Sequence, residues 1–120
     1  MIDVLIVDDD PDLLEMISLA LSNYNMRVDC LNEGKSLIDS VSKKRPDVIL
    51  LDIYLGDTDG RDLCQTIKSS NQYREIPIIL YSAGNITSKS ITESQADAFF
   101  TKPFNIDQLV DRITTLKNQS

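Results

Sequence analysis

Three carboxylates stand side by side at Asp8, Asp9 and Asp10, directly after the apolar run of residues 4–7. Like charges in one cleft repel each other, so such a group has raised pKa values or binds a cation. Oxygen ligands alone favour Mg²⁺, which accepts a few carboxylates and keeps several waters. Asp52 also follows an apolar run, which makes it a further candidate for the same site.

Ser82 and Lys102 add a hydroxyl and an ammonium group, and each stands where an apolar run ends. A divalent ion beside a carboxylate, with Lys102 opposite, would clamp phosphoryl oxygens. An aspartate can itself be the nucleophile and form an acyl phosphate, and Ser82 would then donate a hydrogen bond to the phosphoryl group. The chain has no histidine, which excludes Ser-His and Cys-His catalysis and His-based zinc sites within it.

The elements that must hold these residues follow a regular pattern. Apolar runs alternate with segments whose apolar residues recur at helical spacing. Buried strands rich in Val, Ile and Leu, each followed by an amphipathic helix, indicate an α/β fold with a parallel sheet covered on both faces. In such sheets the site lies at the carboxyl ends of the strands, so we expect these side chains at one edge. The predicted strands span residues 2–7, 27–31, 47–51, 78–81 and 97–101.

Local signals refine three helices. Asp10 is predicted to be a helix N-cap, because Pro11 follows it at the first helical position. This structural role is the preferred one for Asp10. Asn105 likewise caps the last predicted helix. The segment of residues 85–95 is polar, with two isoleucines to bury, and predicts a marginal or thinly packed helix.

Length and charge bound the class of protein. The 120 residues predict one domain, residues 1–120. The net charge of −7 and the lack of a basic run disfavour direct contact with nucleic acid or with an acidic membrane. No apolar run approaches the roughly 18 residues of a membrane span, and no signal-peptide pattern begins the chain, so we expect a soluble, cytoplasmic protein. Cys30 and Cys64 lack metal-ligand spacing and are interpreted as reduced, small core residues.

Four stretches together resemble the receiver domain of bacterial two-component response regulators, over essentially the whole chain. Each stretch alone is a weak signal, whereas the four in this order and at these spacings are a strong one. The resemblance implies a flavodoxin-like, doubly wound (βα)5 fold of the α/β class, with a parallel sheet in the order 2-1-3-4-5 and helices on both faces. The matching stretches are VDDDP at 7–11, LLDIYLGDTDG at 50–60, PIILYSA at 77–83 and KPF at 102–104.

The resemblance assigns roles to the residues at the strand ends. It implies that Asp52 is the phosphoacceptor. Asp8 and Asp9 match the acidic pair that recruits Mg²⁺, with Asp9 as the direct ligand and Asp8 acting partly through water. Asp52 and the backbone carbonyl of Tyr54 would complete the protein's share of the coordination. Lys102 would pair first with Asp52 and then with the phosphoryl oxygens, and its peptide bond to the following proline would be cis.

Two residues match the family's switch, and two depart from its pattern. Ser82 matches the switch hydroxyl. Phe99 matches the aromatic that turns inward, although a simple core aromatic is an equal interpretation; without a hydroxyl, it can couple only through packing. Gly56 stands where many relatives have proline, which predicts a less rigid loop after Asp52. Tyr54 is bulkier than the residues often found there, and we hypothesise that it alters the lifetime of the phosphoryl group.

The function implied by the resemblance is phosphorelay signal transduction. Asp52 would accept a phosphoryl group by in-line transfer from a phosphohistidine of a sensor kinase or phosphotransfer protein, or from a small acyl phosphate. Phosphorylation would bias the surface of the fourth helix, fifth strand and fifth helix toward a downstream effector or a fused output domain outside this chain. Such a domain assists its own phosphorylation and dephosphorylation without being an enzyme. We expect a monomer or a weak dimer.

Other interpretations fit less well. A phosphorylation-independent interaction module of the same fold is the main alternative, but no member of the acceptor set is missing. An aspartate-nucleophile phosphatase needs a second Asp where Tyr54 stands. A calcium loop starting at Asp8 needs Gly in place of Leu13 and Glu in place of Leu19. A flavin phosphate would be repelled by the adjacent aspartates.

Overall fold

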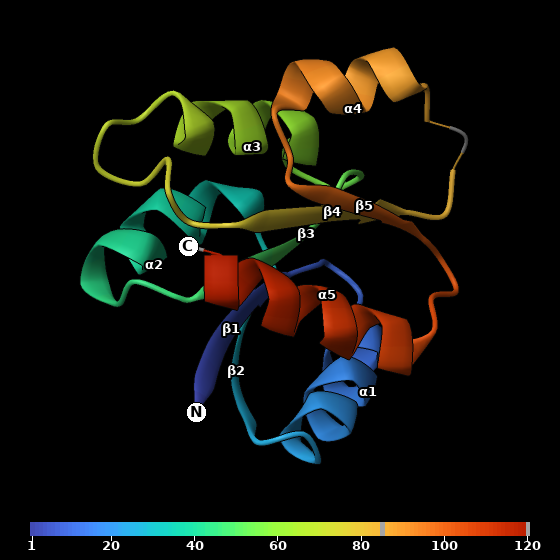
Figure 1. Cartoon of the computed structure of the whole chain (residues 1–120). Helices are drawn as coiled ribbons and strands as arrows, with labels where there is room; N and C mark the ends of the chain where they lie inside the picture. The colour runs from blue at the N-terminus through green and yellow to red at the C-terminus, as the bar shows by residue number, and fades with distance from the viewer. Residues whose placement is uncertain (85, 120) are drawn as a thin grey trace.

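A parallel sheet determines the geometry of the molecule. The computed structural model describes residues 1–84 and 86–119. The described strands pair in parallel in the order β2-β1-β3-β4-β5 (Figure 1), which confirms the doubly wound α/β fold and the strand order implied by the sequence. The strands are β1 (Ile2–Val7), β2 (Met26–Leu31), β3 (Val48–Asp52), β4 (Ile78–Ser82) and β5 (Ala98–Thr101).

Helices connect the strands and cover both faces of the sheet. They are α1 (Pro11–Ser22), the short 3₁₀ turn η1 (Gly34–Ser36), α2 (Leu37–Lys43), α3 (Gly60–Lys68), α4 (Ser88–Ser94) and α5 (Ile106–Gln119). Figure 1 shows α1 and α5 on one face and α2, α3 and α4 on the other. None of the described helices combines the length and the apolar character that crossing a membrane requires.

The two faces of the sheet bury separate apolar clusters, because successive residues of a strand point to opposite faces. In β1, Val4 and Ile6 pack toward α1 and α5, whereas Leu5 and Val7 pack toward α2 and α3. The central strands β3 and β4 are buried along their whole length. Burying one such aliphatic side chain stabilises the folded state by roughly 1.5–3 kcal/mol. The two apolar clusters therefore hold in place the strands whose carboxyl ends carry the polar residues.

Among the described α-helices, α4 buries the least apolar surface. It has seven residues, of which Ser94 is buried. Thr87 caps its N-terminus by accepting a hydrogen bond from the N–H of Ser90 at 3.1 Å, and Gln95 ends it in a left-handed conformation with φ of 67°. This confirms the prediction of a thinly packed helix. Asn85, the first residue of the predicted segment, and Ser120, the last of the predicted domain, lie outside the described residues.

The expectation for the cysteines is half wrong. Cys64 of α3 is buried as predicted, but Cys30 of β2 is exposed. The Sγ of Cys30 lies 3.3 Å from the Oγ of Ser18 at the surface. The reason is that β2 is an edge strand, and an edge strand has less cover than a central one. The spacing of cysteines along the chain carries no information on this position.

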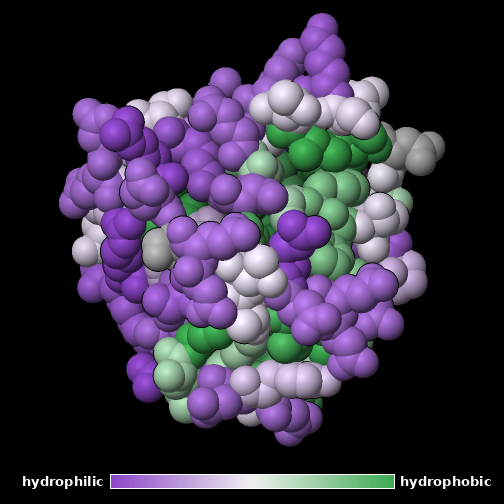
Figure 2. Space-filling model, viewed as in Figure 1, coloured by the Kyte–Doolittle hydropathy of each residue, from purple (hydrophilic) through white to green (hydrophobic). Residues whose placement is uncertain are grey.

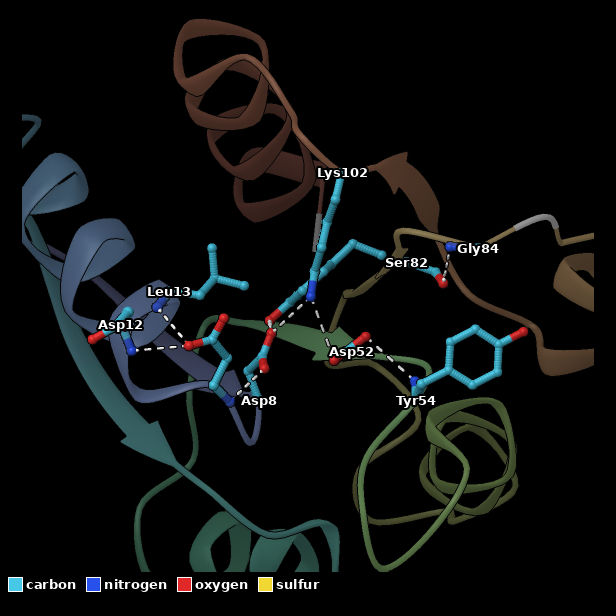
Figure 3. Close-up of polar contacts among 10 residues, drawn as sticks. Asp8, Asp12, Leu13, Asp52, Tyr54, Ser82, Gly84 and Lys102 are labelled. Carbon is cyan, nitrogen blue, oxygen red and sulfur yellow. Dashed lines mark hydrogen bonds and ion pairs between the residues drawn. The ribbon is translucent and has the colours of Figure 1, made fainter.

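The start of α1 confirms the predicted cap. The Oδ1 of Asp10 accepts hydrogen bonds from the N–H groups of Asp12 and Leu13, at 3.0 and 3.4 Å. Pro11 occupies the first helical position, where its missing N–H has no cost. Figure 3 shows these two bonds to the exposed start of the helix.

Replacing Asp10 by alanine is expected to lower the free energy of unfolding by about 1 kcal/mol, because two backbone N–H groups lose their acceptor. Chemical denaturation of the wild type and the variant measures this difference. The matched control is Asp12→Ala, which removes an exposed carboxylate from the same helical turn but no cap, and we expect a smaller loss. Equal losses in the two variants would contradict the capping role of Asp10.

Candidate functional site

The acidic residues predicted from the sequence meet at one edge of the sheet. Asp8 and Asp9 follow β1 and Asp52 ends β3, and these two strands are hydrogen-bonded neighbours. One carboxylate oxygen from each of the three residues lies within 4.8 Å of the others. Asp8 is fully buried and Asp52 is 4% exposed, whereas Asp9 is exposed. We call Asp8, Asp9 and Asp52 the acidic cluster.

Lys102 reaches the acidic cluster from the far side of β4. Its backbone N–H donates to the carbonyl of Ser82 at 2.9 Å, which continues the β4–β5 ladder. Its Nζ lies 3.3 Å from Oδ2 of Asp8 and 3.5 Å from Oδ2 of Asp52 (Figure 3). The ammonium group thus bridges two buried carboxylates. The peptide bond from Lys102 to Pro103 is cis, as the resemblance implied.

One ammonium group does not balance the charge of the acidic cluster. The pKa of the Asp52 carboxyl is raised from 3.8 to about 6, mainly by burial and next by the neighbouring Asp8. Lys102 and the N–H of Tyr54, which donates to Oδ1 of Asp52 at 3.3 Å, act in the opposite direction. A carboxylate that remains hard to ionise beside a lysine indicates a place where another positive charge would be stabilised.

The buried carboxylate of Asp8 has a further partner that sequence reasoning missed. Its Oδ1 accepts from the N–H of Asp10 at 2.9 Å, and its Oδ2 accepts from the hydroxyl of Tyr81 at 2.8 Å. Tyr81 is the next-to-last residue of β4 and is 2% exposed. The signal in the sequence was a tyrosine that follows three aliphatic residues near the carboxyl end of β4.

The predicted switch residues lie on β4 and β5. Ser82 is fully buried, and its Oγ accepts a hydrogen bond from the N–H of Gly84 at 3.0 Å (Figure 3). Phe99 pairs in register with Leu80 and is half-buried against the apolar cluster under α2 and α3. The side chain of Tyr54 is exposed, and its ring lies alongside Gly84, where an added methyl group would stand 3.0 Å from its Cε2.

The loop after β3 is anchored to η1 by Asp57, a residue that sequence reasoning also missed. The two carboxylate oxygens of Asp57 accept from the N–H groups of Gly34 and Lys35, each at 3.0 Å. The bonds from Lys35 and Gly34 lower the pKa of the Asp57 carboxyl. A side chain at Gly34 would overlap the methyl group of Thr58. The loop that contains Gly56 is therefore held at its centre by side-chain contacts.

Arg61 connects the same loop to α4. Asp59 caps α3, and the guanidinium of Arg61 binds its carboxylate at 2.6 and 3.0 Å. This side-chain bonding lowers the pKa of the Asp59 carboxyl. The Nη1 of Arg61 also donates to the Oγ of Ser90 in α4 at 2.8 Å. A polar contact thus links the segment that follows Asp52 to the helix with the least apolar burial.

The donor set of the acidic cluster fits Mg²⁺. All of its side-chain ligands are carboxylate oxygens, which Mg²⁺ prefers, and the exposed Asp9 leaves one side open to water. Asp52 combines a buried carboxylate with a neighbouring ammonium group, which suits a nucleophile toward a phosphoryl group. The geometry brings together the sequence-predicted side chains of Asp8, Asp9, Asp52 and Lys102. The Oγ of Ser82 lies at the end of the adjacent strand.

Comparison with known proteins gives consistent matches. The family model described as the response regulator receiver domain matches residues 4–114. The chain is 34% identical over 119 residues to the transcriptional regulatory protein TrcR of Mycobacterium tuberculosis, covering 98% of this chain and 46% of TrcR. It is 34% identical over 115 residues to the response regulator ArlR of Staphylococcus epidermidis, covering 94% of this chain and 51% of ArlR. The chain spans about half the length of the curated relatives it matches.

A solved structure shares the whole fold. The signal receiver domain of a signal transduction histidine kinase from Syntrophus aciditrophicus has a TM-score of 0.89 at 27% identity, covering 99% of this chain and 92% of that one. The family match extends from within β1 into α5, so it includes β2 to β5, most of β1 and all of the site residues described above. The chain therefore belongs to the family of response regulator receiver domains, as the four sequence stretches implied.

Proposed function

We propose that this receiver domain accepts a phosphoryl group on Asp52 from a partner histidine kinase or phosphotransfer protein. The observation that carries the proposal is the buried carboxylate of Asp52, in one group with two other carboxylates and 3.5 Å from the Nζ of Lys102. A phosphoryl group brings three charged oxygens, and an ammonium at this distance is placed to pair with one of them.

In the proposed reaction, a carboxylate oxygen of Asp52 attacks the phosphorus atom as the nucleophile. The new O–P bond forms while the P–N bond to the donor imidazole breaks, and its electron pair stays on the imidazole nitrogen. The N–H of Tyr54 donates a 3.3 Å hydrogen bond to Oδ1 of Asp52 and so fixes the orientation of the carboxylate. Lys102 exchanges a carboxylate partner for a phosphoryl oxygen, and the hydroxyl of Ser82 donates to another.

The metal site of the proposed reaction uses Asp8, Asp9, Asp52 and the backbone carbonyl of Tyr54. Bound Mg²⁺ would offset the negative charge on the phosphoryl oxygens. Asp9, being exposed, is proposed as the direct ligand, whereas Asp8 already accepts hydrogen bonds on both oxygens and would act partly through water. A domain of this kind assists its own phosphorylation and dephosphorylation, and we propose that it is a phosphoacceptor and not an enzyme.

We propose that the output surface consists of α4, β5 and α5. α4 buries little, so a shift in its position has a small cost. Figure 2 shows hydrophobic surface gathered between α4 and α5, over β5, on an otherwise largely hydrophilic face. Ser82 and Phe99 would transmit the change from Asp52 to this surface. The partner would be a downstream effector protein or a fused output domain, and we propose a cytoplasmic monomer or weak dimer as the acting form.

Incubation with acetyl phosphate and Mg²⁺ is expected to add the mass of one phosphoryl group to the wild type, because Asp52 forms an acyl phosphate. Intact-mass spectrometry measures this gain. Asp52→Asn is expected to show none. If the wild type gains no mass, or the variant gains as much, the acceptor role of Asp52 is refuted and the phosphorylation-independent module becomes the better interpretation.

The same assay separates the metal ligand from the helix cap. Asp9→Ala is expected to abolish the Mg²⁺-dependent gain of mass, because a direct ligand is lost. Asp10→Ala, its neighbour in the sequence, is expected to keep that gain, since its carboxylate caps α1. Similar behaviour of the two variants would show that the division of roles between these aspartates is wrong.

Without metal, Asp52→Asn is expected to be more stable than the wild type at pH 8. The pKa of Asp52 is raised from 3.8 to about 6 in the folded state, so folding favours the protonated carboxyl. The contribution of Asp52 to the free energy of unfolding is therefore complete below about pH 4 and is lost as the pH rises through about 6. A shift of about two units corresponds to at most roughly 3 kcal/mol. Urea unfolding in EDTA at pH 4.5 and pH 8 measures the change. Glu15→Gln, an exposed position on α1, is the control.

The advantage of Asp52→Asn should therefore grow between the two pH values, while Glu15→Gln should follow the wild type. An advantage that is the same at both pH values would mean that burial does not disfavour the ionised carboxylate of Asp52.

Tyr54→Asn is expected to shorten the lifetime of the acyl phosphate. The ring of Tyr54 lies beside Gly84, and we propose that it narrows the approach of water to Asp52. A smaller side chain opens this approach, and we expect roughly two- to ten-fold faster loss of the phosphoryl group, up to about 1.4 kcal/mol in the barrier. Mass spectrometry after removal of the donor gives the rate. Equal rates of phosphoryl loss in the wild type and the variant would show that Tyr54 does not affect the lifetime of the acyl phosphate.

A further inference from the structure

The hydroxyl of Tyr81 is the end of a core side chain that reaches into the acidic cluster. Its ring belongs to the apolar cluster under α1 and α5, and the residue is 2% exposed. A hydroxyl buried to this degree is costly unless it has a partner. The partner is Oδ2 of Asp8 at 2.8 Å, across 73 positions of sequence.

The hydrogen bonds of Asp8 fix the direction of its carboxylate. Oδ2 accepts from the Tyr81 hydroxyl and from Nζ of Lys102, at 2.8 and 3.3 Å. Oδ1 accepts from the N–H of Asp10 at 2.9 Å. A carboxylate oxygen has about two lone-pair sites, so Oδ2 is saturated and Oδ1 keeps one acceptor site for a metal ion or its water.

The ring of Tyr81 is itself held in place. It meets the ring of Phe104 edge to face, with the ring centroids 5.5 Å apart. Nζ of Lys102 lies 5.1 Å from the centroid of the Tyr81 ring, within reach of a cation–π interaction. Tyr81 therefore contacts Asp8 through its hydroxyl and Lys102 through its ring, and these two contacts can be separated by substitution.

We propose that Tyr81 is a positioning residue of the acidic site, which holds Asp8 in the orientation that offers Oδ1 to the metal. The inference rests on the proposed function in so far as the acidic cluster binds Mg²⁺. Tyr81 acts through Asp8 and touches no phosphoryl group. When Lys102 turns to a phosphoryl oxygen, the Tyr81 hydroxyl remains on Oδ2, so the buried carboxylate of Asp8 keeps a donor there. Partners of metal ligands in this position commonly contribute 10- to 100-fold in metal affinity.

Tyr81→Phe tests the proposal, because it removes the hydroxyl and keeps the ring against Phe104 and Lys102. Isothermal titration calorimetry with Mg²⁺ alone, at a temperature where every variant is folded, is expected to show about ten-fold weaker binding. The matched control is Tyr24→Phe, which removes a tyrosine–carboxylate hydrogen bond of 2.6 Å to Asp107 at the surface. The control is expected to bind Mg²⁺ like the wild type. A loss of stability alone would leave the affinity of the folded protein unchanged.

A double-mutant cycle with Asp8→Asn shows whether Tyr81 acts through Asp8. In the Asp8→Asn background, the further change Tyr81→Phe is expected to have little effect on Mg²⁺ affinity, because the group that it positions is already altered. Wild-type affinity in Tyr81→Phe, or a full ten-fold loss in both backgrounds, would overturn the proposal. A wild type that binds Mg²⁺ but gains no phosphoryl group on Asp52 would instead refute the proposed function and leave the role of Tyr81 standing.

Discussion

The mutual repulsion of three carboxylates is the constraint on which the rest of the structure depends. Asp8, Asp9 and Asp52 have oxygens within 4.8 Å of one another, and two of these side chains are buried. Such an arrangement opposes folding, because charged groups lose their hydration. It persists because β1 and β3 are neighbours inside two apolar layers, so the strand order itself forces their carboxyl ends together. Lys102 follows β5, and its ammonium group contacts Asp8 and Asp52, which relieves part of the repulsion.

The sequence predicts the positions of these groups well because they depend on the backbone. Each of these groups follows a run of apolar residues, as Asp8, Asp52, Ser82 and Lys102 do. Parallel strands bring their carboxyl ends to one edge of the sheet, and this does not depend on the side chains at those ends. The cap at Asp10 is equally local. The sequence does not predict contacts that depend on register and side-chain direction across the sheet.

Tyr81 and Asp57 illustrate this limit. The hydroxyl of Tyr81 reaches Asp8 because β4 lies two strands from β1 and presents this residue to the α1–α5 face. Asp57 reaches η1 because the loop after β3 folds over it. Both partners are distant in sequence, and no spacing rule connects them. The exposure of Cys30 follows from the edge position of β2, which the expected strand order already implied but the spacing of the cysteines does not reveal.

The molecule is stiff around the acidic cluster and soft at α4, and this contrast supports the proposed signalling role. Asp57 fixes the loop after Asp52, and Tyr81 fixes Asp8. α4, by contrast, buries one serine and contacts α3 through the hydrogen bond from Arg61 to Ser90. A change of charge inside a stiff site cannot be absorbed there, so it is relieved where restraint is least. A group added to Asp52 would therefore act on α4 without requiring the sheet to move.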